Sequence, residues 1–444
     1  MRKVFILMAA LLATTGSAQQ KWTLEDCINY AMQNSITLKK SKLQMASATE
    51  DLRQSKANLL PSLSLSTNQS LGYRPWLDSG TSTVTNGTVN TKVSKTYYNG
   101  SYGLNASWTV WNGNQNRNQV RLSEVAEQQA ELDWTETANS IQERIAQLYV
   151  QILYMTEAIS VNKQSLETSR LNEQRGQQMV EVGKMSKADL AQLTAQRATD
   201  EYNIVEAESN LANYKLQLKQ LLEITGEQDF DVAMPTASDQ QALADIPSMT
   251  GVYEQALALR PEIKNTELAL QSSDVQLKIA KAGYLPTISM TGGVGTSTSS
   301  SNSNGWGEQM KTNFDASAGI GVSIPIFDQR KTRTAINKAQ IQREQALLDQ
   351  QSKQKELYST IEGYWLDAQT NQQKFRAASA TVESRQQSYD LLSEQFNLGL
   401  KNIVELMTGK TSLLQAQQDR LQSKYMTILN QQLLRFYQGE TMNI

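Results

Sequence analysis

Histidine is absent from the 444 residues, and cysteine occurs once, at Cys27. The lack of imidazole removes the commonest general base of enzymes and the commonest nitrogen ligand of metals. A single cysteine cannot form a disulfide within the chain, so Cys27 is expected to be a small buried apolar residue. The sequence also lacks a nucleophile–base arrangement and a phosphate-binding loop. We therefore expect no catalytic residues, no cofactor and no metal.

Proline is scarce, with 7 residues, and the composition is rich in Gln, Ala, Leu, Lys and Glu, which favours long helices. Beyond the N-terminus there is no long hydrophobic run, and the mean hydropathy is −0.49. Any membrane crossing must then use β-strands, whose apolar pattern is weaker and alternates. A net charge of −2 provides no basic field for nucleic acid, so none is expected as a partner.

The N-terminus has the layout of a secretory signal peptide, expected over residues 1–18. Arg2 and Lys3 precede an apolar run, residues 4–13, and small residues end at Ala18. The alternative, a membrane anchor, is disfavoured because the run is too short for a bilayer core of about 30 Å. A lipoprotein signal is also disfavoured, because no small residues directly precede Cys27. The sequence therefore predicts export from the cytoplasm.

The rest of the chain contains two copies of one unit. Leu60-Pro61 corresponds to Leu285-Pro286, and Val182-Gly183-Lys184 corresponds to Leu398-Gly399-Leu400. The Leu-Pro pairs are further apart in the sequence than the glycine turns, so the first copy has a longer loop between its two strands. The loops are expected at 74–96 and 296–312. We expect copies at residues 19–225 and 251–437, a linker at 226–250 and a C-terminal tail at 438–444.

Each copy is expected to run helix, strand, strand, long helix, turn, helix. The strands alternate apolar and polar residues, and the long segments carry heptad seams such as Ile141, Ile145, Leu148 and Ile152. In the first copy we expect a first helix at 23–60, strands at about 61–73 and 98–111, and helices at about 113–180 and 186–223. In the second we expect strands at about 286–296 and 313–326, and helices at about 328–397 and 402–437.

Four short strands cannot close a barrel, and lipid forbids an open sheet edge, so the chain is expected either to assemble with other copies or to pack a second sheet. Three protomers would supply twelve strands. A helix of about 68 residues is roughly 100 Å long, and the helices at 23–60 and 186–223 are expected to stack end to end beside it. The expected fold is a mixed α/β membrane protein: a coiled-coil helical barrel plus four strands per protomer, completing a trimeric, twelve-stranded transmembrane β-barrel. An ordinary coiled-coil spacer without a lumen is the alternative for the helices.

Aromatic residues gather at the ends of the predicted strands, as in the interfacial girdles of outer-membrane barrels. The alternative is a small soluble β-sandwich with aromatic core residues. The expected membrane-interface residues are Tyr73, Tyr98, Trp108, Trp111, Tyr284, Phe314 and Phe327.

The element order, the two Leu-Pro strand starts, the segment Ala258-Leu259-Arg260-Pro261-Glu262 and the two glycine turns resemble the TolC-type outer-membrane efflux proteins. The resemblance covers about residues 22–437. It implies a homotrimer in outer-membrane lipid with a helical tunnel in the periplasm, which is closed at its tip. It also implies docking to a periplasmic adaptor and, through it, to an inner-membrane pump.

The resemblance assigns roles to the two tip turns. Adaptor contacts fall on Val182, Gly183 and Lys184, and on Leu398, Gly399 and Leu400. Without that resemblance the two glycines read as ordinary helix C-caps. Pairs spaced by three, Ser186 with Asp189 and Asn402 with Glu405, predict capping boxes at the next helices.

By the same resemblance, the gate residues are Phe396, Lys401, Glu405, Thr408 and Asp189. Glu405 would form an acidic ring of three, and Lys401 would pair with Asp189 of a neighbouring helix. Phe396 stands where the best-known members have tyrosine, and Thr408 where they have a second acid. We therefore expect fewer polar ties and weaker block by divalent cations.

The expected function is a passive exit duct of an efflux or type I secretion system. The alternative is a structural or adhesive coiled coil that spans the periplasm. The cargo is open, because drugs, metal ions and polypeptides all use this architecture.

Overall fold

The structure, a computed structural model, describes residues 21–76, 80–84, 87–91, 94–226, 230–235 and 238–442. The signal peptide expected at 1–18 lies outside the described residues, as does the end of the tail. The chain divides into two compact units, one within residues 1–42, 132–264 and 351–444, the other within 43–131 and 265–350. Each unit takes segments from both sequence copies, so the copies are not separate compact bodies.

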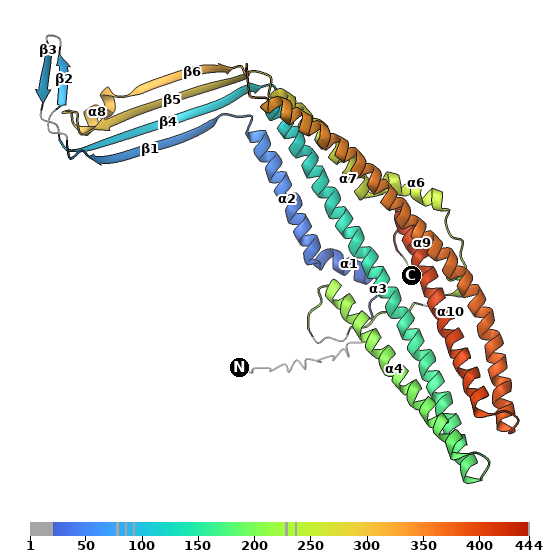
Figure 1. Cartoon of the computed structure of the whole chain (residues 1–444). Helices are drawn as coiled ribbons and strands as arrows, with labels where there is room; N and C mark the ends of the chain where they lie inside the picture. Colours follow the sequence, from blue (N-terminus) through green and yellow to red (C-terminus); the bar gives the residue numbers. More distant parts are fainter. Residues whose placement is uncertain are drawn as a thin grey trace, which may run out of the picture. The chain divides into compact units, whose positions relative to one another are not determined.

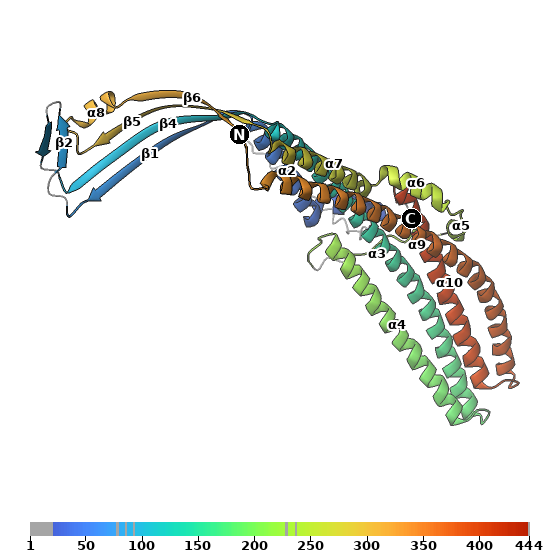
Figure 2. The same cartoon turned by 45° about the horizontal axis from the view of Figure 1, so that its top comes forward.

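One unit contains a four-stranded antiparallel sheet in the order β1-β4-β5-β6 (Figures 1 and 2). The central pair joins the two copies, with Trp108 opposite Met290 and a register shift between Thr109 and Trp111. The strands are β1 (Ser62–Tyr73), β4 (Thr96–Asn112), β5 (Thr287–Ser299) and β6 (Asp315–Ser323). The last strand ends before the expected residue 326, because Pro325 has no amide hydrogen to donate to a neighbour.

The two predicted loops contain secondary structure that the sequence reasoning missed. The loop expected at 74–96 includes a hairpin of β2 (Gly80–Val84) and β3 (Gly87–Thr91). The loop expected at 296–312 contains α8 (Trp306–Thr312), which is fastened to β5 by Gln309. Short hairpins and a helix of about two turns carry little periodicity, which explains the omission.

One face of the sheet exposes its apolar side chains. Leu65 of β1 is 81% exposed and Ile320 of β6 is 71% exposed, although both occupy apolar positions of the alternating pattern. The edge strands β1 and β6 each pair with one neighbour among the described strands. The protomer therefore exposes an apolar surface and has two strand edges whose backbone groups lack a pairing strand among the described residues.

The helices repeat with the two spacings found in the sequence. The helices before the sheet strands are α1 (Leu24–Asn34) and α2 (Ile36–Ala57), which recur at the spacing of the Leu-Pro pairs as α6 (Met249–Leu259) and α7 (Pro261–Ala282). The helices after them are α3 (Gln115–Glu181) and α4 (Lys187–Leu221), which recur at the spacing of the glycine turns as α9 (Lys331–Asn397) and α10 (Ile403–Tyr437). Within the expected linker lies the short helix α5 (Asp239–Ala242). None of the described helices combines the length and apolar composition that a membrane crossing needs.

The single first helix expected in each copy is instead two helices. The break falls at Ser35 (ψ 124°) in the first copy and at Arg260 (ψ 130°) in the second. Arg260 precedes Pro261, and the proline ring disfavours helical geometry at the preceding residue. The break in the first copy falls at the matching position without a proline.

The heptad seams form the helical core. Ile145 and Ile152 of α3 and Ile361 of α9 are fully buried, as the spacing predicts. At the junction of two shorter helices, the Ile36 amide at the start of α2 donates to Glu223 Oε1 just beyond α4, at 3.3 Å. The N-terminus of α2 therefore meets the C-terminal end of α4, in agreement with the expected end-to-end arrangement.

Candidate functional site: the helical tips

Each long helix ends in a glycine turn of the same construction. Gly183 has φ +73° and Gly399 has φ +76°, the left-handed region in which glycine has no Cβ penalty. The amide of Lys184 donates to Met179 O (2.8 Å), and the amide of Gly183 donates to Val180 O (3.1 Å). Leu400 and Gly399 donate in the same way to Gln395 and Phe396. These are Schellman turns, so the interpretation of both glycines as C-caps is confirmed.

The following helices begin with side-chain caps. Asn402 Oδ1 accepts from the Glu405 amide (2.9 Å), and Glu405 Oε2 accepts from the Asn402 amide (3.2 Å), which completes a capping box. At α4, Ser186 Oγ accepts from the Asp189 amide (3.0 Å), but the Asp189 carboxylate accepts from the Ser186 hydroxyl instead of its amide. The reciprocal box expected at α4 is therefore only half formed.

Glu405 has a cationic partner within its own chain. Lys401 Nζ lies 2.6 Å from Glu405 Oε1, and both side chains are partly exposed. The hydrogen bond from Lys401, followed by that from the Asn402 amide, lowers the pKa of Glu405 below its ordinary value. Within the protomer, then, Lys401 pairs with Glu405 and not with Asp189. Lys401 directly precedes the N-cap Asn402, and Glu405 lies in the first turn of α10, so the capped turn brings the two side chains together.

Phe396 is part of a small apolar core behind the turn. It is 6% exposed and belongs to a buried cluster with Leu193, Tyr389, Ile403, Leu406 and Leu413. Within the protomer its ring is therefore buried behind the turn. Thr408 is exposed, and its hydroxyl donates to Val404 O at 2.8 Å.

The extreme tips expose apolar side chains. Val182 is 68% exposed, Leu398 75% and Leu400 70%. A Cβ placed on Gly183 or Gly399 would meet nothing within 4 Å, so both turns are open on their outer side. Each tip is thus a small apolar surface of fixed backbone geometry.

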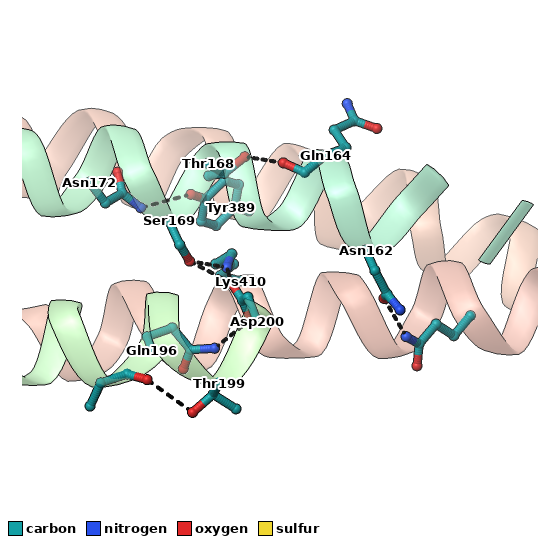
Figure 3. A network of polar contacts seen from close by, with 12 residues as sticks. Asn162, Gln164, Thr168, Ser169, Asn172, Gln196, Thr199, Asp200, Tyr389 and Lys410 are labelled. Atoms are coloured by element: carbon teal, nitrogen blue, oxygen red, sulfur yellow. Dashed lines mark hydrogen bonds and ion pairs between the residues drawn. The ribbon is translucent and has the colours of Figure 1, made fainter. Parts of the chain in front are cut away.

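Sequence reasoning missed a buried polar network a few turns away from the tips (Figure 3). Lys410 of α10 forms an ion pair with Asp200 of α4 and also donates to Ser169 of α3. Asp200 further accepts from Ser169 Oγ (2.6 Å) and Gln196 Nε2 (2.9 Å). The Lys410 and Asp200 side chains are 7% and 3% exposed. The network therefore ties the hairpin of the first copy to the last helix of the second.

A signal for this network was present in the sequence. On α10 the buried positions Ile403, Leu406, Lys410 and Leu413 step by three, four and three. Lys410 therefore occupies a seam position that normally holds an apolar residue. Burial lowers its pKa, although the bond to Asp200 opposes the shift. Asp200 likewise shares the buried face of α4 with Leu193, Ile204 and Ala207.

The expected interface aromatics lie at the two ends of the sheet. Tyr98 is opposite Leu71 near the end that carries α8, with Tyr73 and Phe314 beside that end. Trp108 and Trp111 are opposite Met290 and Ile288 near the start of α3, and Trp108 Nε1 donates to Leu59 O at 2.9 Å. Of the group, Tyr73, Tyr284, Phe314 and Phe327 are more than half exposed.

Comparison with known proteins supports one family. Its sequence model, described as outer membrane efflux protein, matches residues 27–223 and 252–440. The chain is similar to the outer membrane efflux protein BepC of Brucella suis, with 23% identity over 95% of this chain and 87% of that protein. It is also similar to the outer membrane protein TolC of Escherichia coli, with 22% identity over 96% of this chain and 84% of that protein.

Solved structures share the fold. The structure of CusC aligns with a TM-score of 0.80 and 18% identity, covering 94% of this chain and 92% of that chain. The Campylobacter jejuni CmeC outer membrane channel aligns with a TM-score of 0.76 and 20% identity, covering 95% and 87%. The family model covers most of the chain in two segments, and the gap between them coincides with the segment expected as a linker. The chain belongs to the outer membrane efflux protein family.

Proposed function

We propose that three copies of this chain form the outer-membrane exit duct of a tripartite efflux or type I secretion system. One observation carries the proposal: a four-stranded sheet with an exposed apolar face and two open edges leads directly into a helix of 67 residues. Lipid tolerates neither an open edge nor unpaired backbone groups. Edge-to-edge pairing of β1 with β6 of the next copy gives a closed wall of twelve strands.

The helices extend this wall on the periplasmic side. The seams of α3 and α9 bury apolar residues within the protomer, while many side chains on their other faces are polar and exposed. A ring of such helices encloses water without a hydrophobic lumen. The cargo then crosses without chemical change, and the energy comes from the pump.

The tips are the surface we assign to the periplasmic adaptor. Val182, Leu398 and Leu400 supply exposed apolar contacts, and Lys184 adds a charge to the first turn. Apolar side chains on two rigid turns suit packing against the helical hairpin of a partner. The adaptor connects the duct to an inner-membrane pump.

We assign the gate to Glu405, which forms an ion pair with Lys401. Thr408 lies about one turn further along α10. In a trimer three copies of Glu405 form an acidic ring that binds cations at the opening. Phe396 supports this region from the core.

Planar-bilayer recording tests the proposal. The purified protein is expected to give uniform ionic conductance steps, and Leu65→Asp on the exposed apolar face is expected to abolish them by preventing insertion. Ser64→Asp, on the opposite face of the same strand, is the matched control and should still conduct. The absence of steps from the folded wild-type protein would refute the duct.

A further inference from the structure

A groove lined by four cations lies where the sheet meets the helices. Arg117 and Arg121 come from the first two turns of α3, and Lys278 and Lys281 from the last two turns of α7. The groove has a volume of about 570 Å³ and is also lined by two asparagines, Asn114 and Asn118. Among the residues that the structure describes, no acid lines it.

All four cations are exposed, and none forms an ion pair with another described residue. Arg117 and Arg121 are spaced by four and share one face of α3, an arrangement in which like charges repel. Four cations around one groove, without a counter-charge, indicate an anionic ligand.

The equivalent positions of the first copy make a useful comparison. Lys278 and Lys281 correspond to Arg53 and Lys56 of α2, at the spacing that separates the two Leu-Pro pairs. Arg53 pairs with Glu50 at 2.5 Å, and Lys56 pairs with Glu124 at 3.8 Å. In the first copy, the cations at these positions pair with acids of the protein. In the second copy, the corresponding Lys278 and Lys281 have no acid among the residues that line the groove.

The groove also offers apolar contact. Leu285, which lines it, is 44% exposed, and the adjacent Tyr284 is 53% exposed. Trp108 and Trp111 precede the groove residue Asn114 in the chain, at the end of β4. Aromatic residues beside cations at the end of a membrane strand are typical of the headgroup region of a bilayer. The pattern fits a ligand with an anionic head and an apolar body, rather than a small soluble anion.

We propose that this groove binds the phosphate headgroup of an anionic phospholipid from the periplasmic leaflet of the outer membrane. Arg117, Arg121, Lys278 and Lys281 contact the phosphate, and Leu285 contacts the start of the acyl chains. The choice of a lipid as the source rests on the proposed function, which places this end of the sheet at a membrane surface.

The test is native mass spectrometry of the full detergent-purified assembly with added phosphatidylglycerol, phosphatidylcholine or inorganic phosphate. Phosphatidylglycerol should bind more tightly than phosphatidylcholine. The double variants Arg117→Gln/Arg121→Gln and Lys278→Gln/Lys281→Gln should each weaken its binding roughly tenfold. The control Lys264→Gln/Lys355→Gln removes two exposed cations outside the groove and should leave binding unchanged. Circular dichroism confirms that each variant is folded.

Three results would overturn the lipid site: equal binding of the two lipids, unchanged binding by the groove variants, or an equal loss in the control. Displacement of phosphatidylglycerol by an equal concentration of inorganic phosphate would instead assign the groove to a soluble anion. Conductance recorded on the same samples separates the two proposals. A wild-type protein that conducts but fails the lipid test loses only the lipid site, whereas one that does not conduct loses the duct.

Discussion

Lys401 Nζ, just before α10, and Glu405 Oε1, in its first turn, lie 2.6 Å apart, so the acid assigned to the gate carries its own counter-ion. In the proposed gate, the pairing weakens the negative field of each Glu405, because the ammonium group compensates part of the charge. The resemblance implied that Lys401 pairs with Asp189 of a neighbouring helix. A gate with internally paired acids is expected to bind divalent cations more weakly than one with free carboxylates.

Neutralising the gate acid should relieve cation block. Glu405→Gln removes the charge at nearly constant size, so the concentration of divalent cation for half-block should rise about fivefold or more. Single-channel recording measures it. The control Glu383→Gln removes an exposed acid of α9 away from the turn and should leave block unchanged. Unchanged block in Glu405→Gln would remove Glu405 from the gate.

Removing the counter-ion should have the opposite effect. Lys401→Gln leaves Glu405 charged but unpaired, so half-block should occur at a lower divalent concentration, by a factor of about two to five. Titrating magnesium against the conductance of this variant checks the prediction. A higher concentration for half-block would mean that the pair does not restrain the acid.

The block should also depend on pH in a defined direction. The pKa of Glu405 lies below its ordinary value of 4.5 because Lys401 and the Asn402 amide stabilise the carboxylate. The charge is therefore fully present above pH 4.5, and block should disappear only as the pH falls through the lowered pKa. The capping and pairing stability of this turn is lost over the same interval. A Glu405→Gln channel should show no such transition, and a transition centred above pH 4.5 would contradict the assignment.

The buried ion pair makes a stability prediction. Lys410→Met leaves Asp200 buried without its cation and should destabilise the helical unit by about 3–5 kcal/mol. Lys410→Met/Asp200→Leu removes both charges and should recover most of that loss. Thermal unfolding followed by circular dichroism measures the series. The single variant Asp200→Leu completes the series. If the stability lost in the double variant equals the sum of the losses in the two single variants, Lys410 and Asp200 do not act as a pair.

The tip glycines can be tested through backbone geometry alone. Gly399→Ala places a Cβ in open space but forces alanine to φ +76°, so it should destabilise the turn by about 1 kcal/mol. Gly363→Ala is the matched control. Its Cβ also meets nothing within 4 Å, but it lies inside α9, where alanine should stabilise by about 0.5–1 kcal/mol. Equal effects of the two substitutions would show that the positive φ is unimportant.

Much of the fold could be predicted because each predicted element of one sequence copy has a counterpart in the other copy. The spacings of the Leu-Pro pairs and of the glycine turns reappear in the bounds of the helices, and α3 and α9 both have 67 residues. Periodicity identified the seams, since Ile145 and Ile361 occupy positions that only burial explains. Periodicity did not identify the breaks at Ser35 and Arg260. Pro261 marks the second break, whereas no proline marks the first.

The tip was only partly predictable. The glycine spacing predicted both turns, because few other residues adopt a positive φ without strain. The partners of the charged side chains could not be predicted from the sequence. Lys401 had two candidate acids, Glu405 and Asp189, and the choice between them depends on helix geometry that begins only at Ile403. The seam position of Lys410 indicated burial, but its partner Asp200 lies 210 residues earlier and could not be identified from the sequence.

The mass of the detergent-purified particle is the most direct test of the account, because everything depends on chains sharing one wall. Light scattering that separates the protein from the detergent counts the chains in a particle that also carries ionic conductance. We predict three chains. A particle of one chain that still inserts into lipid and conducts would contradict the account.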